Sequence, residues 1–267
     1  MRMESGNTYW ADRALLEWQI ELGASDAIQD SPVDRYALEA SKPKEAVKPA
    51  ETKPSGPPPI PQQEIVDGAV EAAKFAQAAG DLAALQVAVG NFAHCDLRKG
   101  ARNAVFAVGQ PSARVMIVGE APNRAEDRSG TPFVGEEGVL LGKMLAAIGL
   151  SLGTEDVAMG VYVAAPIPWR APNDGPPSAK DAAMMKPFLE RHIALADPAV
   201  VILMGNTPLQ MLTGQGGLAR RRGKWIEVAG KPALPMFHPV QLLKNPAAKR
   251  EAWADLLSLK AKLKELS

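Results

Sequence analysis

The chain has 267 residues, of which 46% are hydrophobic and only 5% aromatic, so it can hold one substantial domain with a mainly aliphatic core. Thirty basic residues balance thirty acidic ones, which argues against a protein that coats nucleic acid nonspecifically, although a local basic stripe can still bind DNA. The single cysteine, Cys95, excludes an intramolecular disulfide and a metal site built from cysteines. No apolar run is long enough for a membrane span, and the N-terminus lacks a signal core, so we expect a cytoplasmic protein.

Two N-terminal segments differ in composition from the rest of the chain. Residues 1–24 place apolar side chains at helical spacing, which predicts a short amphipathic helix. Residues 25–63 are rich in Pro, Lys, Glu and Ser, and a segment of this composition buries too little apolar surface to offset its ordering entropy. We therefore expect a disordered linker. The helix is either a poorly ordered extension or a docking element for an unidentified protein partner, with Trp10, Leu15 and Trp18 as anchors.

Residues 64–267 alternate between short apolar runs and helical patterns. The runs predict strands at Arg114–Val118, Val161–Ala164, Val200–Met204, Ile226–Val228 and Ala233–Phe237. The helical patterns lie at about 64–90, 137–149, 178–195, 206–213 and 246–264. This order predicts an α/β three-layer sandwich with a central, mainly parallel sheet. Ligands of such sheets bind beyond the carboxyl ends of the strands.

A glycine-rich segment with a carboxylate follows the first predicted strand. Gly119 and Ala121 allow a ligand to approach the backbone closely, and Glu120 is placed to orient or activate water. Phe133 follows on a turn rather than in a periodic strand. Each feature alone is typical of a loop with a solvated acid and a core phenylalanine, but their combination favours a binding site.

A His-Pro pair, beginning at His238, ends the last predicted strand. A lone histidine is more often structural than catalytic. However, Leu242, Leu243 and Lys244 follow it, and an apolar wedge beside cations suits a loop that extrudes a base from DNA. Periodicity alone equally allows both leucines to be the first core positions of the final helix.

A basic cluster lies at residues 220–224 and includes Arg222 and Lys224. Such a cluster is usually a solvated turn. It also fits an edge that contacts DNA phosphates, which position a protein on the duplex without reading its sequence.

Taken in order, these segments resemble the family 4, iron–sulfur type of uracil-DNA glycosylase, over residues from about 88 to 264. The resemblance is carried by the segments Gly119–Gly135, Val161–Tyr162, Trp169–Pro172, Lys186–Leu189, Arg222–Trp225, His238–Pro239 and Leu242–Leu243. It implies a uracil-DNA glycosylase-like fold. It also implies hydrolysis of the N-glycosidic bond of uracil, or of another deaminated base, in DNA during base-excision repair.

The resemblance also implies roles for single residues. Uracil would lie on Phe133, His238 would stabilise the negative charge that develops at O2, and Glu120 would polarise the attacking water or stabilise the sugar cation. The base-binding set is Gly119, Ala121, Phe133 and Ala165. Leu242 or Leu243 would fill the vacated stack. The phosphate-binding set is Arg222, Lys224, Lys244 and Lys249.

Members of that family usually hold a [4Fe–4S] cluster through four cysteines. Here only Cys95 matches, and Phe92, Trp169 and Met185 stand at the other three positions. We therefore predict that the chain has no metal or other cofactor, with apolar packing in place of the cluster.

Three further positions depart from the family pattern. Ala165 stands where the family has an asparagine whose amide pairs with the uracil edge, and its loss should weaken both uracil binding and rejection of cytosine. Asn123 replaces a glycine, and Val240 replaces a serine whose hydroxyl could bind phosphate.

These departures leave two alternatives to uracil excision. One is a DNA-binding member of the superfamily that has lost catalysis, and the other is a glycosylase of shifted specificity. We place excision first because Glu120, Phe133 and His238 are all present. The expected partner is DNA that contains a damaged base, and the default oligomeric state is a monomer.

Overall fold

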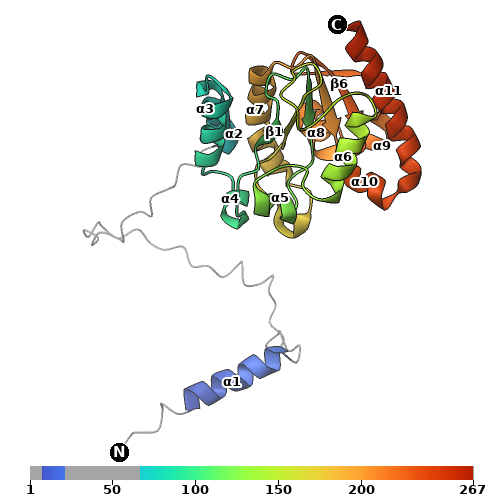
Figure 1. The fold of residues 1–267 in the computed structure, drawn as a ribbon. Helices are drawn as coiled ribbons and strands as arrows, with labels where there is room; N and C mark the ends of the chain where they lie inside the picture. The colour runs from blue at the N-terminus through green and yellow to red at the C-terminus, as the bar shows by residue number, and fades with distance from the viewer. Residues whose placement is uncertain (1–7, 22–66, 267) are drawn as a thin grey trace, which may run out of the picture. The chain divides into compact units, whose positions relative to one another are not determined.

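The computed structural model describes residues 8–21 and 67–266, which fall in two compact units, 1–62 and 63–267 (Figure 1). In the first unit, helix α1 spans Thr8–Glu21. The side chains of Leu15, Leu16 and Trp18 on this helix are exposed. The side chain of Trp10 and the predicted linker at 25–63 lie outside the described residues. None of the described helices has the length and apolarity needed to cross a bilayer.

The second unit is built around one six-stranded sheet of order β1-β3-β2-β4-β6-β5. Its strands are β1 (Ala107–Gly109), β2 (Val115–Val118), β3 (Val161–Ala164), β4 (Val200–Met204), β5 (Ile226–Val228) and β6 (Lys231–Met236). Strands β3, β2, β4 and β6 are parallel, and the edge strands β1 and β5 run antiparallel to their neighbours. The predicted α/β fold with a mainly parallel sheet is confirmed, while β1 had not been predicted.

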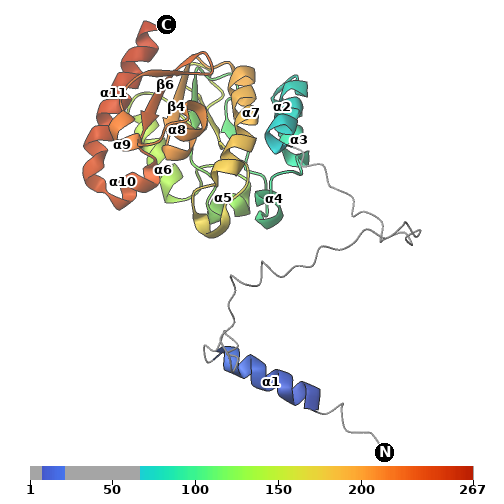
Figure 2. The same ribbon diagram turned by 180° about the vertical axis from the view of Figure 1, so that it is seen from behind.

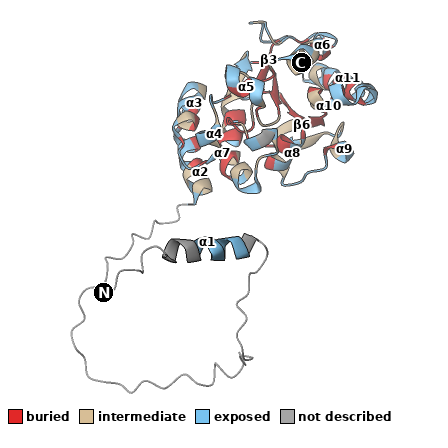
Figure 3. Ribbon diagram, turned by 90° about the horizontal axis from the view of Figure 1, so that it is seen from below, coloured by how far each residue is buried: buried red, intermediate tan, exposed pale blue. Residues whose placement is uncertain are grey.

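Helices cover both faces of the sheet, as the end-on view shows (Figure 3). On one face lie α7 (Ala179–Ala196) and α8 (Asn206–Thr213), with α2 (Gly68–Ala78) and α3 (Leu82–Asn91) packed against α7. On the other lie α6 (Glu136–Ala146), α10 (Pro239–Lys244) and α11 (Lys249–Glu265). The shorter helical segments are α4 (Leu97–Gly100), α5 (Arg124–Ser129), η1 (Pro172–Asp174), α9 (Leu218–Arg221) and η2 (Pro246–Ala248).

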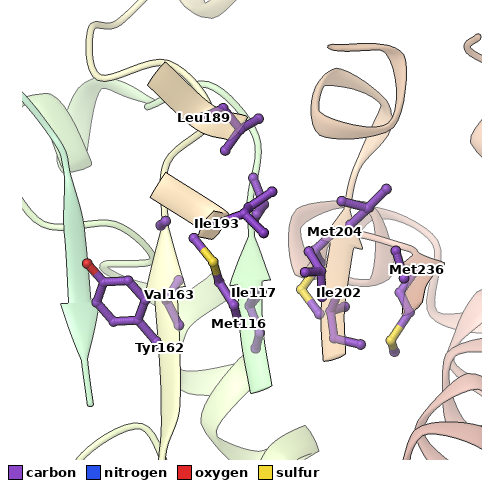
Figure 4. Close-up of a cluster of buried hydrophobic side chains, with 14 of the residues drawn as sticks. Met116, Ile117, Tyr162, Val163, Leu189, Ile193, Ile202, Met204 and Met236 are labelled. Atoms are coloured by element: carbon purple, nitrogen blue, oxygen red, sulfur yellow. The ribbon is translucent and has the colours of Figure 1, made fainter. Parts of the chain in front are cut away.

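Every residue of β2, β3 and β4 is buried, because helices cover both faces of these strands. This explains why their sequences are continuous apolar runs rather than alternating ones. Side chains from the neighbouring parallel strands and from α7 meet in the core, where Met116, Ile202 and Ile193 are essentially inaccessible to solvent (Figure 4).

The C-terminal region differs in one respect from the prediction. The expected helix at 246–264 is divided into η2 and α11, and the residues after the His-Pro pair form the separate helix α10. Pro246 explains the break, because a proline cannot donate the backbone hydrogen bond that would continue α10. Helix α10 lies at the same end of the domain as α5 (Figures 1 and 2).

Candidate active site

The carboxyl ends of the four parallel strands bring the predicted site residues to one edge of the sheet. Gly119 follows β2 and donates its N–H to the carbonyl of Ala164 at 3.0 Å, at the end of β3. Gly205 follows β4 and donates to the carbonyl of Met236 at 3.1 Å, at the end of β6. The loops that start there carry Glu120, Ala165 and His238, so residues from distant segments share one site.

Glu120 binds the N-terminus of α8. Its Oε1 accepts the backbone N–H of Asn206 at 2.5 Å, and both carboxylate oxygens lie 3.3 Å from the N–H of Thr207. The first N–H groups of a helix lack partners within the helix, so a carboxylate is stabilised there. A Cβ at Gly205 would lie 2.2 Å from Oε1 of Glu120, so this contact requires a glycine. The α8 N-terminus was missed by the sequence analysis.

Phe133 lies between Gly119 and His238. Its ring centroid is 4.8 Å from that of His238, with the two planes tilted by 30°. A Cβ at Gly119 would come within 2.6 Å of the Phe133 ring, and a Cβ at Gly138 would lie 1.9 Å from the Phe133 carbonyl oxygen. The backbone φ of Phe133 is +54°, a conformation that bulky residues rarely adopt. Phe133 is therefore held in an uncommon backbone geometry beside the candidate catalytic histidine.

His238 is the N-cap of α10, and its Nδ1 accepts the N–H of Val240 at 3.3 Å. Burial lowers the pKa of this imidazole to about 4, so the ring is neutral at pH 7. In a neutral ring whose Nδ1 is an acceptor, the hydrogen resides on Nε2. His238 therefore offers one N–H donor to a ligand.

Glu126, which the sequence analysis missed, is buried next to Phe133. Its carboxylate accepts the N–H groups of Phe133 and Asn123, the second at 2.9 Å. The Asn123 side chain in turn accepts the N–H of Glu126 at 3.1 Å, which completes a capping box at the start of α5. Burial raises the pKa of Glu126 to about 7, although both backbone donors oppose the shift. The Asn-x-x-Glu spacing is a signal that identifies this residue from sequence.

Ala165, the position predicted to face the base edge, lacks a side-chain hydrogen-bonding group. Ala165 donates its backbone N–H to the carbonyl of Phe106 at 3.0 Å and lines a cavity of about 20 Å³ with His192. Asn123 does not replace the missing amide, because its Nδ2 donates to Glu137 and its Oδ1 belongs to the capping box. Ala121 is half-buried in the adjacent loop.

An open hollow of about 610 Å³ lies beside this site, between α5, α6 and α10. Val240, Leu243 and Lys244 form its α10 side. Leu243 is 39% exposed, whereas Leu242 is 1% exposed and packs in the core. Of the two leucines predicted as alternatives for the wedge, Leu242 is thus the core residue, because α10 turns its side chain toward α6 and α11, and Leu243 remains the candidate.

The predicted phosphate-binding residues divide into two kinds. Arg222 is bound to Asp255, with guanidinium-to-carboxylate distances of 2.5 and 3.0 Å, and also contacts Glu251. The predicted phosphate contact of Arg222 stays a prediction, although its guanidinium is already paired within the domain. Lys224, Lys244 and Lys249 are exposed, and each remains a candidate for a phosphate contact.

The four positions that correspond to the family's cluster cysteines are buried in the hydrophobic core. The ring of Phe92 packs edge-on against that of Phe188, with centroids 5.2 Å apart. The Cys95 thiol lies 3.7 Å from Asp181, and burial raises its pKa to about 11, which keeps it protonated. Phe92, Trp169 and Met185 offer no thiolate, so this donor set does not fit an iron–sulfur cluster. Elsewhere among the described residues, no group of three His, Cys, Asp or Glu side chains is arranged to hold a metal ion.

Comparison with known proteins identifies the family of this α/β domain. The model of the uracil DNA glycosylase superfamily matches residues 106–257, which include all of the parallel strands and the site at their carboxyl edge. The chain belongs to the uracil DNA glycosylase superfamily.

Relatives within the superfamily are similar over most of the second unit. The Type-4 uracil-DNA glycosylase of Archaeoglobus fulgidus is 35% identical over 170 residues, which is 60% of this chain and 82% of that protein. The enzyme of the same name from Thermotoga maritima is 33% identical over 154 residues, or 57% of this chain and 77% of the relative. The Type-4 uracil-DNA glycosylase of Pyrobaculum aerophilum is 32% identical over 187 residues, which is 66% of this chain and 91% of that protein.

Proposed function

We propose that this protein is a DNA glycosylase that hydrolyses the N-glycosidic bond of uracil, or of another deaminated base, in DNA. The observation that carries the proposal is the Phe133–His238 ring pair beside Gly119 and Glu120 at the carboxyl edge of the sheet. The names of the relatives support the same chemistry. Excision requires the target nucleotide to leave the stack and enter the site, where its base would lie against Phe133.

His238 supplies the stabilisation of the leaving base. As the bond between C1′ of the sugar and the base nitrogen breaks, its electron pair passes to the base and negative charge develops at the carbonyl oxygen. The Nε2–H of neutral His238 donates a hydrogen bond to that oxygen. A donor held by its own backbone contact needs no reorganisation during the reaction, which favours the transition state.

Glu120 orients the water that attacks C1′. Its Oε1 is the oxygen bound most closely by the α8 N-terminus, whereas Oε2 makes only a 3.3 Å contact with the N–H of Thr207. The less engaged oxygen keeps acceptor capacity for the hydrogen of a water molecule. The same carboxylate stabilises the positive charge that develops on the sugar.

Ala165 favours a second candidate function. Without an amide at this position, the site has no side-chain group there that pairs with the edge of uracil and discriminates against cytosine. The second candidate is a DNA-binding superfamily member that has lost excision.

The two candidates are separated by an excision assay. Labelled single-stranded and double-stranded oligonucleotides carrying one uracil or one hypoxanthine would be incubated with the protein and then treated with alkali to cleave abasic sites. Damage-dependent scission that is lost in His238→Ala and Glu120→Ala is expected. DNA binding without scission of any substrate would reject excision and leave the non-catalytic candidate.

A further inference from the structure

Besides Glu120, the site region contains a buried carboxylate, Glu126, which binds the backbone of Phe133, the candidate base-stacking residue. Glu126 is 7% exposed, and its two carboxylate oxygens are used separately. Oε1 accepts the N–H of Phe133, and Oε2 accepts the N–H of Asn123. One buried side chain therefore links the start of α5 to the turn that carries the aromatic ring.

The backbone of Phe133 needs such an anchor. Its φ of +54° is unfavourable for a residue with a bulky side chain, so the neighbouring structure must hold it. The carbonyl of Phe133 meets the first turn of α6 at Gly138, where no Cβ fits. The N–H on the other side meets Glu126. The N–H of Phe133 is thus held by a hydrogen bond, and its carbonyl is confined by close packing against Gly138.

The contacts of Asn123 extend this arrangement to the hollow beside the site. Its Nδ2 donates to Glu137 in the first turn of α6, and both residues line the hollow. Its Oδ1 accepts the N–H groups of Ala125 and Glu126, at 2.8 and 3.1 Å. Asn123 therefore connects the Glu126 anchor with α6, the helix against which the Phe133 carbonyl packs.

We propose that Glu126 is a positioning residue, whose carboxylate holds the Phe133 backbone so that the ring presents a fixed face to an extruded base. The functional part of this inference rests on the proposed excision activity. Glu126 does not contact the base in this role. It acts by setting the place of the Phe133 ring relative to His238, and the distance between those two rings is itself measurable.

The test compares Glu126→Gln and Glu126→Ala with the matched control Asp127→Asn. A glutamine can accept only one of the two N–H bonds, because its NH₂ group would face the other donor. Asp127 lies in the same helix, is equally buried at 7%, and accepts backbone N–H groups of Arg102 and Asn103 at 2.8 and 3.3 Å. Both of these N–H groups bind Oδ1, so the control removes the charge of an equally buried carboxylate while its remaining amide oxygen can still accept them, in a loop that does not carry Phe133.

The first readout is the NMR spectrum of the histidine rings, which does not require activity. His238 lies against Phe133, so its ring protons experience the ring current of that phenylalanine. His94 and His192 lie against Phe92 and Phe106 and serve as internal references in the same spectrum. The His238→Ala protein assigns the signal.

The expected result is that the His238 signals move toward ordinary imidazole positions in both Glu126 variants. They stay in place in Asp127→Asn, and the references do not move in any variant. In single-turnover excision, the maximal rate falls at least tenfold in Glu126→Gln. The DNA concentration at half-maximal rate does not change, because exposed phosphate-binding lysines are unaltered.

Unchanged His238 signals in both Glu126 variants would overturn the proposal, since the ring would then be held without the carboxylate. An equal displacement in Asp127→Asn would also overturn it, because general loosening of α5 would be the cause. An inactive wild-type protein whose His238 signals move only in the Glu126 variants would reject the proposed excision while supporting the positioning role.

Discussion

Two regions of the domain differ in how much of the family pattern they keep. At the positions of the cluster cysteines, apolar side chains replace thiolate ligands and pack in the core. At the carboxyl edge of the sheet, Glu120, Phe133 and His238 remain, in mutually supporting contacts with the glycines around them. A cluster that only holds structural elements together can be replaced by apolar packing. Few other side chains could take over the roles proposed for Glu120, Phe133 and His238. The predictions below test this contrast.

The largest expected effect concerns the cluster region. Phe92→Ala removes a fully buried ring that packs on Phe188, which should reduce the free energy of unfolding by about 3–5 kcal/mol. Urea unfolding followed by circular dichroism measures this change. Val87→Ala, at an exposed position of α3, is the control and should change stability little. A Phe92→Ala protein as stable as the control would show that packing does not replace the cluster.

At the sheet edge, we expect a large loss of excision rate rather than of stability. His238→Ala removes the proposed donor to the leaving base, which should lower the single-turnover excision rate by about 10²–10³. His94→Ala, at an exposed histidine far along the chain, is the matched control. An excision rate that is equal in both proteins would assign the stabilisation of the base to another group.

The pH dependence of stability should separate Glu126 from the buried histidines. Because the folded pKa of Glu126 is raised to about 7, its contribution is fully present below pH 4.5 and is lost as the pH rises through 7. His192 and His238 have folded pKa values near 4, so their contributions are present above pH 6.5 and are lost as the pH falls.

Wild-type and Glu126→Gln proteins would therefore be unfolded with urea at several pH values between 4.5 and 7. The difference in their unfolding free energies should change by about 1.4 kcal/mol per pH unit in this window, with the wild type gaining as the pH falls. A constant difference would show that Glu126 has an ordinary pKa.

A smaller effect is expected from restoring the missing amide. Ala165→Asn should increase the preference for uracil over cytosine about tenfold, which corresponds to one hydrogen bond of about 1.4 kcal/mol. Competition between oligonucleotides carrying the two bases measures it, and Ala165→Leu is the control for added volume. No gain in preference would show that the position does not face the base edge.

The smallest effect, a null one, is expected from iron removal. We propose that the domain folds without a cluster, so prolonged treatment with an iron chelator should leave the melting temperature and excision unchanged. Iron in stoichiometric amount in protein purified without oxygen would contradict this expectation.

The central strands and most helices were predictable because each buried strand is a continuous apolar run between turn residues. Strand β1 was missed because it has only three residues, two of them exposed, and so has no apolar signal. Leu242 and Leu243 are adjacent and chemically alike, and only the direction of α10 decides which one is buried.

Within the candidate site, the motif residues Glu120, Phe133 and His238 were predictable from sequence. The contacts that hold these residues in place were harder to predict. The contact of Glu120 with the α8 N-terminus joins residues 86 positions apart, and no local pattern encodes it. Glu126 could have been found, since Asn123 and Glu126 have the spacing of a capping box. Long-range pairing is thus the part that a single sequence does not specify.

The pairing of Arg222 has a consequence for the last helix. Asp255 of α11 holds this arginine, whose guanidinium lies 5.5 Å from the centroid of Phe237, the residue before His238. Through this pair, helix α11 supports the end of β6 that precedes His238, the candidate catalytic histidine. A fluorescent label or an affinity tag attached after Glu265 should leave excision intact, whereas trimming the chain back past Asp255 should disable it.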